Sequence, residues 1–342
     1  MDEDNSDKVT PMSNPLLDPV ERMLLQSGLT RRDALRLSAA GLVLAVPGVA
    51  MAQQPAAPFN ARKFKPGTVK PVKPTGEPIK VDMDKVRASL RNKGNFKFEG
   101  EELYYAIEVS GSDAARASVR VGKRQKARGT TYVPLAAQAV SHGFFAKSYP
   151  IDNKADTFIN FKTLQPIKSD KFIKESGEER IYKVRYEPGN FSARVERTAK
   201  AEKKKAESRK FVRAVPETIH DAFSWLFELR MEPLKKGDVY YYFVYDGWKL
   251  SKLKVKVTGK GKATTPLGKF STMKVDIERE VLNSRWPKGS KNKTEPKLTR
   301  RQKPYYFSTI HLTDDELRTP VRIYVTSSKA DSELKLVKYV AP

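Results

Sequence analysis

Short runs in which apolar and polar residues alternate fill most of the chain after residue 102. A period of two places successive side chains on opposite faces of a strand, and Gly, Pro, Asn and Asp between the runs are typical of turns. The pattern therefore predicts a mainly β fold built from antiparallel strands. The predicted strands are Leu103–Val109, Ala115–Val121, Thr131–Ala139, Thr157–Phe161, Gln165–Lys174, Arg180–Tyr186, Phe191–Thr198, Val239–Tyr245, Lys249–Val257, Phe270–Val281, Tyr306–Leu312, Val321–Thr326 and Ser332–Val340.

One segment has a helical period instead. Between Thr218 and Met231 apolar residues recur three and four positions apart, and Pro233 follows shortly after, so we expect one core-covering helix there. Pro188-Gly189-Asn190 and the dipeptide Asp246-Gly247 predict hairpin turns. The stretch Lys288–Lys303 is polar and basic, and we expect it to be a structureless insertion.

The first 94 residues predict an export signal and a linker. Arg31 and Arg32 lie in a segment that resembles a twin-arginine motif, and an apolar stretch of thirteen residues, 37–49, follows it. Ala50-Met51-Ala52 is a small-x-small cleavage pattern, with Ala50 and Ala52 as the small residues. The alternative is a membrane anchor, but the stretch is shorter than the roughly 20 residues that span a bilayer. We therefore expect a signal over residues 1–52, a Pro- and Lys-rich linker over 53–94 and one β domain over 95–342.

Composition narrows the possible chemistry. The chain of 342 residues has no Cys, which excludes disulfides, thiolate nucleophiles and Cys-ligated metals. It contains 65 Lys and Arg against 40 Asp and Glu, a net charge of +25. Loss of residues 1–52 would remove five basic and seven acidic side chains and raise this charge to +27. Such a charge favours anionic partners.

Four blocks in the same order resemble the Domain of Unknown Function 3108 family. They are Glu101-Glu102-Leu103-Tyr104-Tyr105, Asp221-Ala222-Phe223-Ser224 with Glu228-Leu229-Arg230, Thr265-Pro266-Leu267-Gly268-Lys269-Phe270, and Leu312-Thr313-Asp314-Asp315 with Thr319-Pro320-Val321-Arg322. The resemblance implies an exported bacterial protein with a strongly curved antiparallel sheet, half-barrel or barrel-like, and one helix. It implies no catalytic residues. His311 stands where an aromatic residue is common in the family.

Basic residues alternate with apolar ones in several predicted strands, which places a basic row on one face. The candidate ligand-binding residues on such rows are Lys252, Lys254, Lys256, Arg116 and Arg120, and Lys183 and Arg185 repeat the pattern. Tyr241 and Trp248 belong to an aromatic segment with rings on both strand faces, one expected under the helix and the other lining the concave face. The alternatives are lysine rows that only protect sheet edges and solubilise the surface, and aromatic rings that only pack a core.

Catalytic signals are weak. His142, His220 and His311 are isolated in the sequence, and no nucleophile elbow, phosphate loop or dinucleotide motif is present. Asp314 and Asp315 predict a turn, and Asp221 and Arg230 are expected to tie the helix ends to the sheet. We therefore predict no metal site, no cofactor and no catalytic residues.

The sequence thus predicts a non-catalytic protein of the periplasm or cell envelope, exported after folding by the export machinery. Its expected partner is a lipid, an acidic glycan or another envelope protein, and nucleic acid is disfavoured because no recognition motif is present. The alternative is an enzyme acting on cell-wall or lipid material with dispersed catalytic residues.

Overall fold

The computed structural model describes residues 96–127, 129–175, 177–202, 204–290, 294–301, 305–326 and 331–342. The predicted signal, with Arg31, Arg32, Ala50 and Ala52, and the predicted linker up to residue 94 lie outside these residues.

The described part is mainly β, as the alternation predicts. Seventeen strands form one sheet. Their bounds are β1 Glu102–Val109, β2 Ser112–Val121, β3 Gln125–Ala127, β4 Thr130–Ser141, β5 Asp152–Asn160, β6 Pro166–Glu175, β7 Glu178–Glu187, β8 Ser192–Ala201, β9 Glu207–Ala214, β10 Ile219–His220, β11 Val239–Tyr245, β12 Leu250–Thr265, β13 Gly268–Arg285, β14 Lys297–Arg300, β15 Tyr305–Thr313, β16 Pro320–Thr326 and β17 Asp331–Val340.

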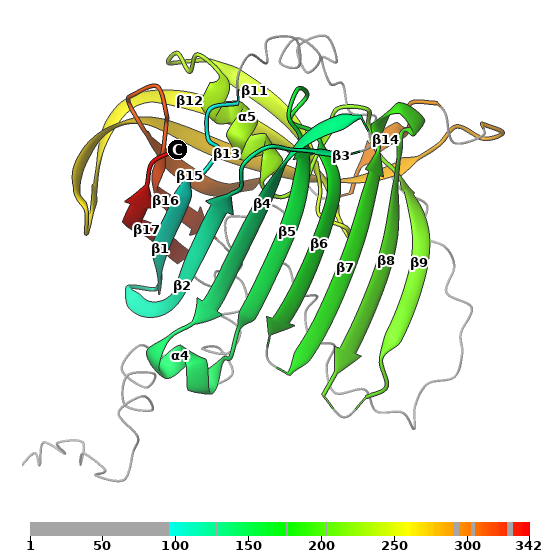
Figure 1. Cartoon of the computed structure of the whole chain (residues 1–342), viewed down its shortest axis with the longest axis horizontal. Helices are drawn as coiled ribbons and strands as arrows, with labels where there is room; N and C mark the ends of the chain where they lie inside the picture. Colours follow the sequence, from blue (N-terminus) through cyan, green and yellow to red (C-terminus); the bar gives the residue numbers. More distant parts are fainter. Residues whose placement is uncertain are drawn as a thin grey trace, which may run out of the picture.

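Most strands pair with their neighbours in sequence, so the sheet is an antiparallel meander (Figure 1). The hydrogen-bonded order runs β9–β8–β7–β6–β5–β4–β2–β1–β17–β16–β15–β13–β12–β11–β10. β3 pairs with β4, and β14 pairs with β13. Only β10 and β11 are parallel. The first and last strands, β1 and β17, therefore lie side by side in the middle of the sheet.

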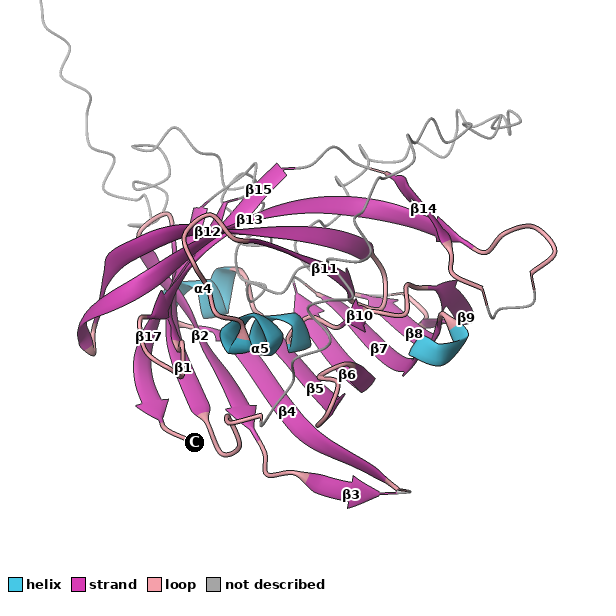
Figure 2. Ribbon diagram, turned by 90° about the horizontal axis from the view of Figure 1, so that it is seen from above, coloured by secondary structure: helices cyan, strands magenta, loops and turns pink. Residues whose placement is uncertain are grey.

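The sheet bends around a central helix, and its two halves face each other (Figure 2). Helix α5, Ser224–Met231, lies between the β12, β13 and β15 layer and the β1 to β5 layer. We call the sheet face that carries Leu103, Leu135 and Ile277 the inner face, because these residues share one core with Trp225 and Phe227 of the helix. The opposite side is the outer face.

The two ends of the sheet overlap instead of joining. Phe243 lies directly opposite Lys252, and Tyr245 and Leu250 lie two residues further along their strands, so all four side chains share one face. This face is the outer face. The three apolar residues nevertheless form a second core with Tyr182 and Val184. Tyr182 and Val184 belong to the inner face. Val184 lies opposite Ser169, and Ser169 lies opposite Thr157, whose hydroxyl donates a hydrogen bond to Asp221 just before the helix. The outer face of the edge strands β10 and β11 therefore packs against the inner face of β7 and β8. We call this contact the overlap seam. Among the described residues the sheet is not closed into a barrel.

Several sequence-based boundaries are wrong. The helix begins at Ser224 rather than Thr218, because Ile219–His220 forms strand β10 against β11. A second helix, α4 Gly143–Ser148, and a 3₁₀ turn, η2 Pro188–Asn190, are also present. The stretch Lys288–Lys303 is not wholly structureless, because Lys297–Arg300 forms β14. β3 and β9, which are polar, were not predicted.

Candidate functional site

Three of the four family-like sequence blocks converge at helix α5. Asp221 accepts hydrogen bonds on Oδ1 from the backbone N–H groups of Phe223 (3.1 Å) and Ser224 (2.8 Å), so it caps the helix. Its other oxygen, Oδ2, accepts a hydrogen bond of 2.6 Å from the hydroxyl of Thr157 on β5. The expectation that Asp221 ties the start of the helix to the sheet is therefore confirmed.

Arg230 ties the end of the helix to the start of the sheet. Its two terminal nitrogens donate to the carboxylate of Glu101 at 2.7 and 2.6 Å, and both side chains are buried. The guanidinium also lies 4.0 Å from the ring centre of Phe98, and its Nε donates to the carbonyl of Leu317. A buried bidentate pair of this kind stabilises the fold only while both partners are present, because removal of one leaves the other charge buried without a counter-charge.

The segment after β15 completes this cluster. Asp315 accepts hydrogen bonds from the N–H groups of Leu317 and Arg318, which forms the predicted turn. Arg318 then donates to the carbonyls of Arg230 and Glu232 at the end of the helix. Asp314 contacts Lys260 at 2.8 Å on the surface. The turn interpretation of these carboxylates is confirmed.

A His of strand β10 and a Ser and a Glu of helix α5 come together beside this cluster. The Nδ1 atom of His220 lies 3.1 Å from the Ser224 hydroxyl, and its Nε2 atom lies 3.1 Å from the carboxylate of Glu228. The spacing of four residues between His220, Ser224 and Glu228 is a sequence signal for this arrangement, and it is overlooked when each histidine is considered alone. His220, Ser224 and Glu228 are only 2%, 0% and 1% exposed, respectively. The Ser224 hydroxyl already accepts a hydrogen bond from the backbone N–H of Asp221. No substrate carbonyl can reach this hydroxyl without opening of the fold.

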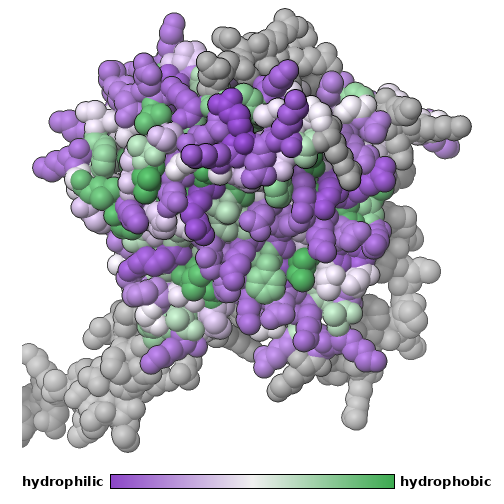
Figure 3. Space-filling view, viewed as in Figure 1, coloured by the Kyte–Doolittle hydropathy of each residue, from purple (hydrophilic) through white to green (hydrophobic). Residues whose placement is uncertain are grey.

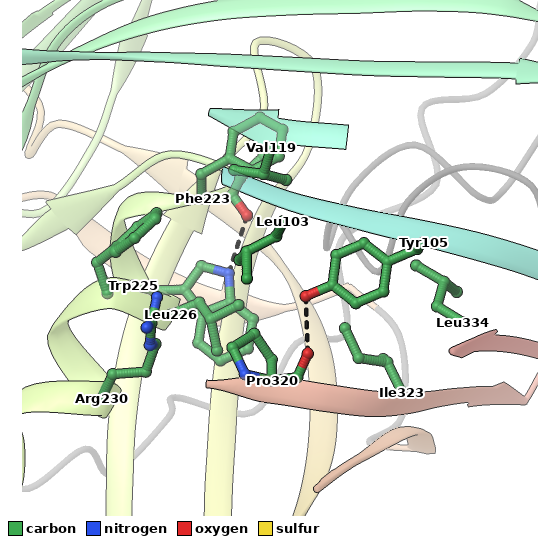
Figure 4. A pocket seen from close by; sticks show the side chains of 12 residues that line it. Leu103, Tyr105, Val119, Phe223, Trp225, Leu226, Arg230, Pro320, Ile323 and Leu334 are labelled. Atoms are coloured by element: carbon green, nitrogen blue, oxygen red, sulfur yellow. Dashed lines mark hydrogen bonds between the residues drawn. The ribbon is translucent and has the colours of Figure 1, made fainter. Parts of the chain in front are cut away.

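An apolar pocket lies on the other side of the helix (Figure 4). Its volume is about 50 Å³. Phe223 and Leu226 of the helix segment face Leu103, Val119 and Ile323 of the sheet across it. Ser224 does not line it, so the pocket and the Ser–His–Glu arrangement are separate. Small-molecule sites measure roughly 300–1,000 Å³, so this pocket is too small for a whole lipid.

The predicted lysine row lies on the outer face, beside a row of carboxylates. Lys252, Lys254 and Lys256 align with Glu280, Glu278 and Asp276 of β13. The Lys252 ammonium lies 2.6 Å from Glu280, and that of Lys254 lies 3.9 Å from Glu278. Burial would raise the pKa of Glu280, but Lys252 and Arg300 outweigh it and hold this pKa below its usual value. Much of the positive charge of the row is therefore locally balanced.

The other predicted basic positions have similar surroundings. Arg116 pairs with Asp113 through two hydrogen bonds, and Arg120 lies opposite Glu102 on β1. Figure 3 shows that the outer face of the β1 to β9 half is mostly hydrophilic, with separate small apolar groups. The structure thus places Lys252, Lys254 and Lys256 beside Tyr241, which lies opposite Lys254, but Arg116 and Arg120 lie apart from them on β2.

The two predicted aromatic positions lie at the overlap seam. Tyr241 is half-buried and packs against the second core, in the overlap seam. The next residue, Tyr242, points to the opposite face and belongs to the first core, where its ring centre lies 6.0 Å from that of Trp225. One face of β11 thus packs under the helix, as expected, and the other packs into the seam. Trp248 is 45% exposed, and the guanidinium of Arg197 lies 4.8 Å from its ring centre.

Within the described ranges, no group of His, Asp and Glu residues could hold a metal ion. None of the helices that the structure describes is long and apolar enough to cross a membrane.

Solved structures with a similar arrangement have very low sequence identity. A protein from Bacteroides fragilis, described as exported and as having a YmcC-like fold, is 9% identical, with a TM-score of 0.30 over 71% of this chain and 99% of that one. A β-barrel-like DUF1849 protein from Brucella abortus is 10% identical, with a TM-score of 0.40 over 72% and 99%. A protein from Parabacteroides distasonis described as a lipoprotein is 9% identical, with a TM-score of 0.31 over 72% and 100%.

Comparison with curated proteins yields no match. A family model does match, over residues 102–336, and it contains all of the sequence blocks that surround α5 except Glu101. The chain therefore belongs to the DUF3108 family, described as a protein family of unknown function.

Proposed function

We propose that this chain is an exported cell-envelope protein that binds an anionic envelope component on its surface, without catalysis. The observation that carries the proposal is the packed interior of the described residues. Helix α5 packs against the inner face, and a second core occupies the overlap seam. The apolar pocket beside α5 has a volume of about 50 Å³, which is too small for a lipid, so docking on the outside is favoured.

The charge supports an anionic partner. The net charge of +25 attracts polyanions over distances set by the ionic strength, through an interaction that salt weakens. Phosphorylated lipids and acidic glycans are the envelope components with this chemistry. Carboxylates opposite the predicted lysine row reduce its local field, so the contact surface is expected to extend beyond this row.

An enzyme acting on cell-wall or lipid material is the alternative. The geometry that favours it is the hydrogen-bonded set of Ser224, His220 and Glu228. A serine nucleophile must meet its substrate carbonyl next to an oxyanion site, and the Ser224 side chain is fully buried. We therefore favour a structural role for this set.

A sedimentation experiment tests the proposal. Protein purified from the periplasm is mixed with vesicles of neutral phospholipid alone or with added anionic phospholipid, and separately with an immobilised acidic glycan, at low and high salt. We expect binding to one of the anionic materials that high salt removes, and no binding to neutral vesicles. Absence of binding to both anionic materials at low salt would contradict the proposal.

Two triple variants locate the contact. Lys252→Gln, Lys254→Gln and Lys256→Gln remove three charges from the predicted row, and Lys200→Gln, Lys204→Gln and Lys205→Gln remove the same number near the β8–β9 connection. Because carboxylates already balance the row, we expect equal losses of binding from the two variants. A selectively larger loss from the row variant would assign the contact to the row.

A further inference from the structure

A row of basic and aromatic side chains crosses four neighbouring strands on the inner face. Lys171 of β6 lies directly opposite Tyr182 of β7. Arg197 of β8 lies directly opposite Tyr182 on one side and Arg209 of β9 on the other. Residues that lie directly opposite each other share a face of the sheet, and Tyr182 belongs to the inner face. We call these four residues the inner-face row.

The turn between β11 and β12 places Trp248 beside this row. Asp246 accepts a hydrogen bond of 2.7 Å from the backbone N–H of Trp248 on Oδ1, which fixes the turn. The Lys171 ammonium donates to the carbonyl of Asp246, and a Cβ on Gly247 would lie 3.4 Å from a ring carbon of Tyr182. Two members of the inner-face row therefore hold the turn in place.

Arg197 connects the turn to the row. Its guanidinium lies 4.8 Å from the ring centre of Trp248 and 5.8 Å from that of Tyr182, within the range of cation–π contacts. Its Nε donates to the Tyr182 hydroxyl at 3.4 Å, and no hydrogen bond of its terminal nitrogens is found among the described residues. A guanidinium on an aromatic face still presents N–H donors in its own plane, so Arg197 can bind an acceptor there.

The positive charge of the row is only partly balanced. Within the described part of the chain Arg197 forms no ion pair, and Arg209 pairs at 3.3 Å with Glu207, where the two side chains are 64% and 69% exposed. Arg197 and Arg209 also lie directly opposite each other, and like charges at such positions repel. An anion bound to both arginines would remove this repulsion.

The surface around Trp248 is open to solvent. Trp248 is 45% exposed and Arg209 is exposed, while Arg197 is half-buried. Phe211 makes an edge contact with the Trp248 ring, with ring centres 6.4 Å apart, and leaves the rest of the ring accessible. Among the described strands β9 pairs only with β8, so the inner-face row ends at an open edge of the sheet. The surface is a shelf that a long ligand can cross.

We propose that Trp248, Arg197 and Arg209 form a binding site for an acidic sugar unit of an envelope glycan. A sugar ring has an apolar face of C–H groups that packs on a flat indole, and its carboxylate accepts paired hydrogen bonds from guanidinium groups. Phosphatidylglycerol offers a negative charge without a sugar ring, so the exposed indole favours the glycan. This site rests on the proposed function and deepens it by naming the class of anion and the place where it binds.

Titration calorimetry of the exported full chain with oligogalacturonate tests the site. The methyl ester of the same oligosaccharide keeps the sugar rings without the charge, and we expect it to bind about tenfold more weakly or less well still. Trp248→Ala should weaken the affinity for oligogalacturonate about tenfold or more, as for an aromatic residue at the centre of a contact. Arg209→Gln should weaken it about tenfold, as for loss of one hydrogen bond to a charged group.

Matched variants elsewhere on the surface serve as controls. Phe144→Ala removes an aromatic side chain of α4 that is 40% exposed, and Arg194→Gln removes an exposed outer-face arginine that pairs with Glu187. Both should leave the affinity unchanged. If Trp248→Ala and Arg209→Gln bind oligogalacturonate as well as these controls, the site is overturned.

Thermal unfolding without ligand separates binding from folding. If Arg197 only holds the turn against the sheet, Arg197→Gln should lower the Tm and keep the affinity for oligogalacturonate, and this result would overturn the proposal. If Trp248 stacks on a sugar ring, Trp248→Phe should recover part of the affinity that Trp248→Ala loses. Arg209→Gln, at an exposed position, tests the charge without a risk to folding.

Vesicles of neutral phospholipid with added phosphatidylglycerol distinguish a lipid from a glycan. Binding of these vesicles, but not of oligogalacturonate, that depends on Trp248 and Arg209 would assign the surface to a lipid and overturn the acidic sugar. Salt-sensitive binding to either material that these substitutions do not change would overturn the site and leave the proposed function standing. Absence of binding to both materials would contradict the site and the proposed function together.

Discussion

Single residues decide how the start of the sheet and the end of the helix meet. Glu101 and Arg230 are 129 residues apart and form a buried bidentate ion pair. Both residues stand in the sequence blocks that predicted the family, and a role for Arg230 at the end of the helix could be anticipated. Its partner could not, because a pairing over this separation depends on the path of the whole sheet.

Breaking this pair should be costly. We expect Glu101→Gln to lower the free energy of unfolding by about 3–5 kcal/mol, because it leaves the buried guanidinium of Arg230 without a counter-charge. The exposed pair of Arg116 and Asp113 is the control, and Arg116→Gln should cost less than about 1 kcal/mol. Urea unfolding followed by circular dichroism measures both. Equal effects would show that the buried pair has no special weight.

Ser224 provides a second test at the scale of the residue. Ser224→Ala leaves the N–H of Asp221 and the Nδ1 atom of His220 without their partner, so we expect a loss of about 1–3 kcal/mol in stability. In the folded wild type, the buried hydroxyl should not react with a fluorophosphonate probe. Labelling of Ser224 in the native protein would contradict the structural role and favour the enzyme.

At the scale of elements, the alternation of apolar and polar residues predicts where strands lie more accurately than where they begin and end. Strands with strict alternation, such as β7 and β12, were predicted because one face packs into a core. β9 and β14 have few buried residues, so no periodic signal marks them. The predicted helix was too long, because Ile219 and His220 fit a helical period but pair with β11 instead. Tertiary contact overrode local propensity at this point.

The turn between β11 and β12 should be sensitive to a single added carbon. Gly247 has a φ of +92°, and a Cβ there would lie 2.9 Å from a methyl carbon of Val184 across the overlap seam. Gly111 has a similar φ of +80° with nothing within 4 Å. Gly111→Ala should cost about 1–2 kcal/mol through backbone strain alone, and Gly247→Ala about 1–3 kcal/mol more through overpacking. Equal losses in urea unfolding would argue that the seam is loosely packed.

The strand position of His311 predicts a pH dependence. Burial, Lys274 and Arg322 lower the pKa of His311, while Asp276 and Glu333 oppose them, and Thr272 lies within hydrogen-bond distance of its Nδ1 atom. The folded state therefore favours the neutral ring. Its contribution to stability is complete above the ordinary pKa of about 6.5 and is lost as the pH falls below it toward the lower folded value.

Substitution of His311 should remove this contribution. We expect the urea midpoint of the wild type to fall between about pH 7 and pH 5 more steeply than that of His311→Phe, which keeps a ring at this position but cannot be protonated. Identical slopes for wild type and His311→Phe would show that other groups govern this pH range.

At the scale of the whole molecule, the overlap of the sheet ends could not be inferred from the sequence. The apolar side chains of Phe243 and Tyr245 alternate with those of Tyr242 and Val244, which indicates two apolar faces. From the sequence alone, the second face could either line a concave surface or pack into a core. In the structure it is buried against β7 and β8, because the far half of the sheet wraps over this edge. Only the three-dimensional path of the meander distinguishes these two environments.

This overlap leads to a prediction about bound cargo. A carrier that shields an acyl chain needs an internal space several times larger than the pocket of about 50 Å³ beside α5. Native mass spectrometry of protein gently purified from the periplasm should therefore give the mass of the polypeptide without a lipid-sized adduct. A stoichiometric lipid adduct that persists in high salt would contradict the filled interior, because a lipid held only by charge on the surface would dissociate under that condition.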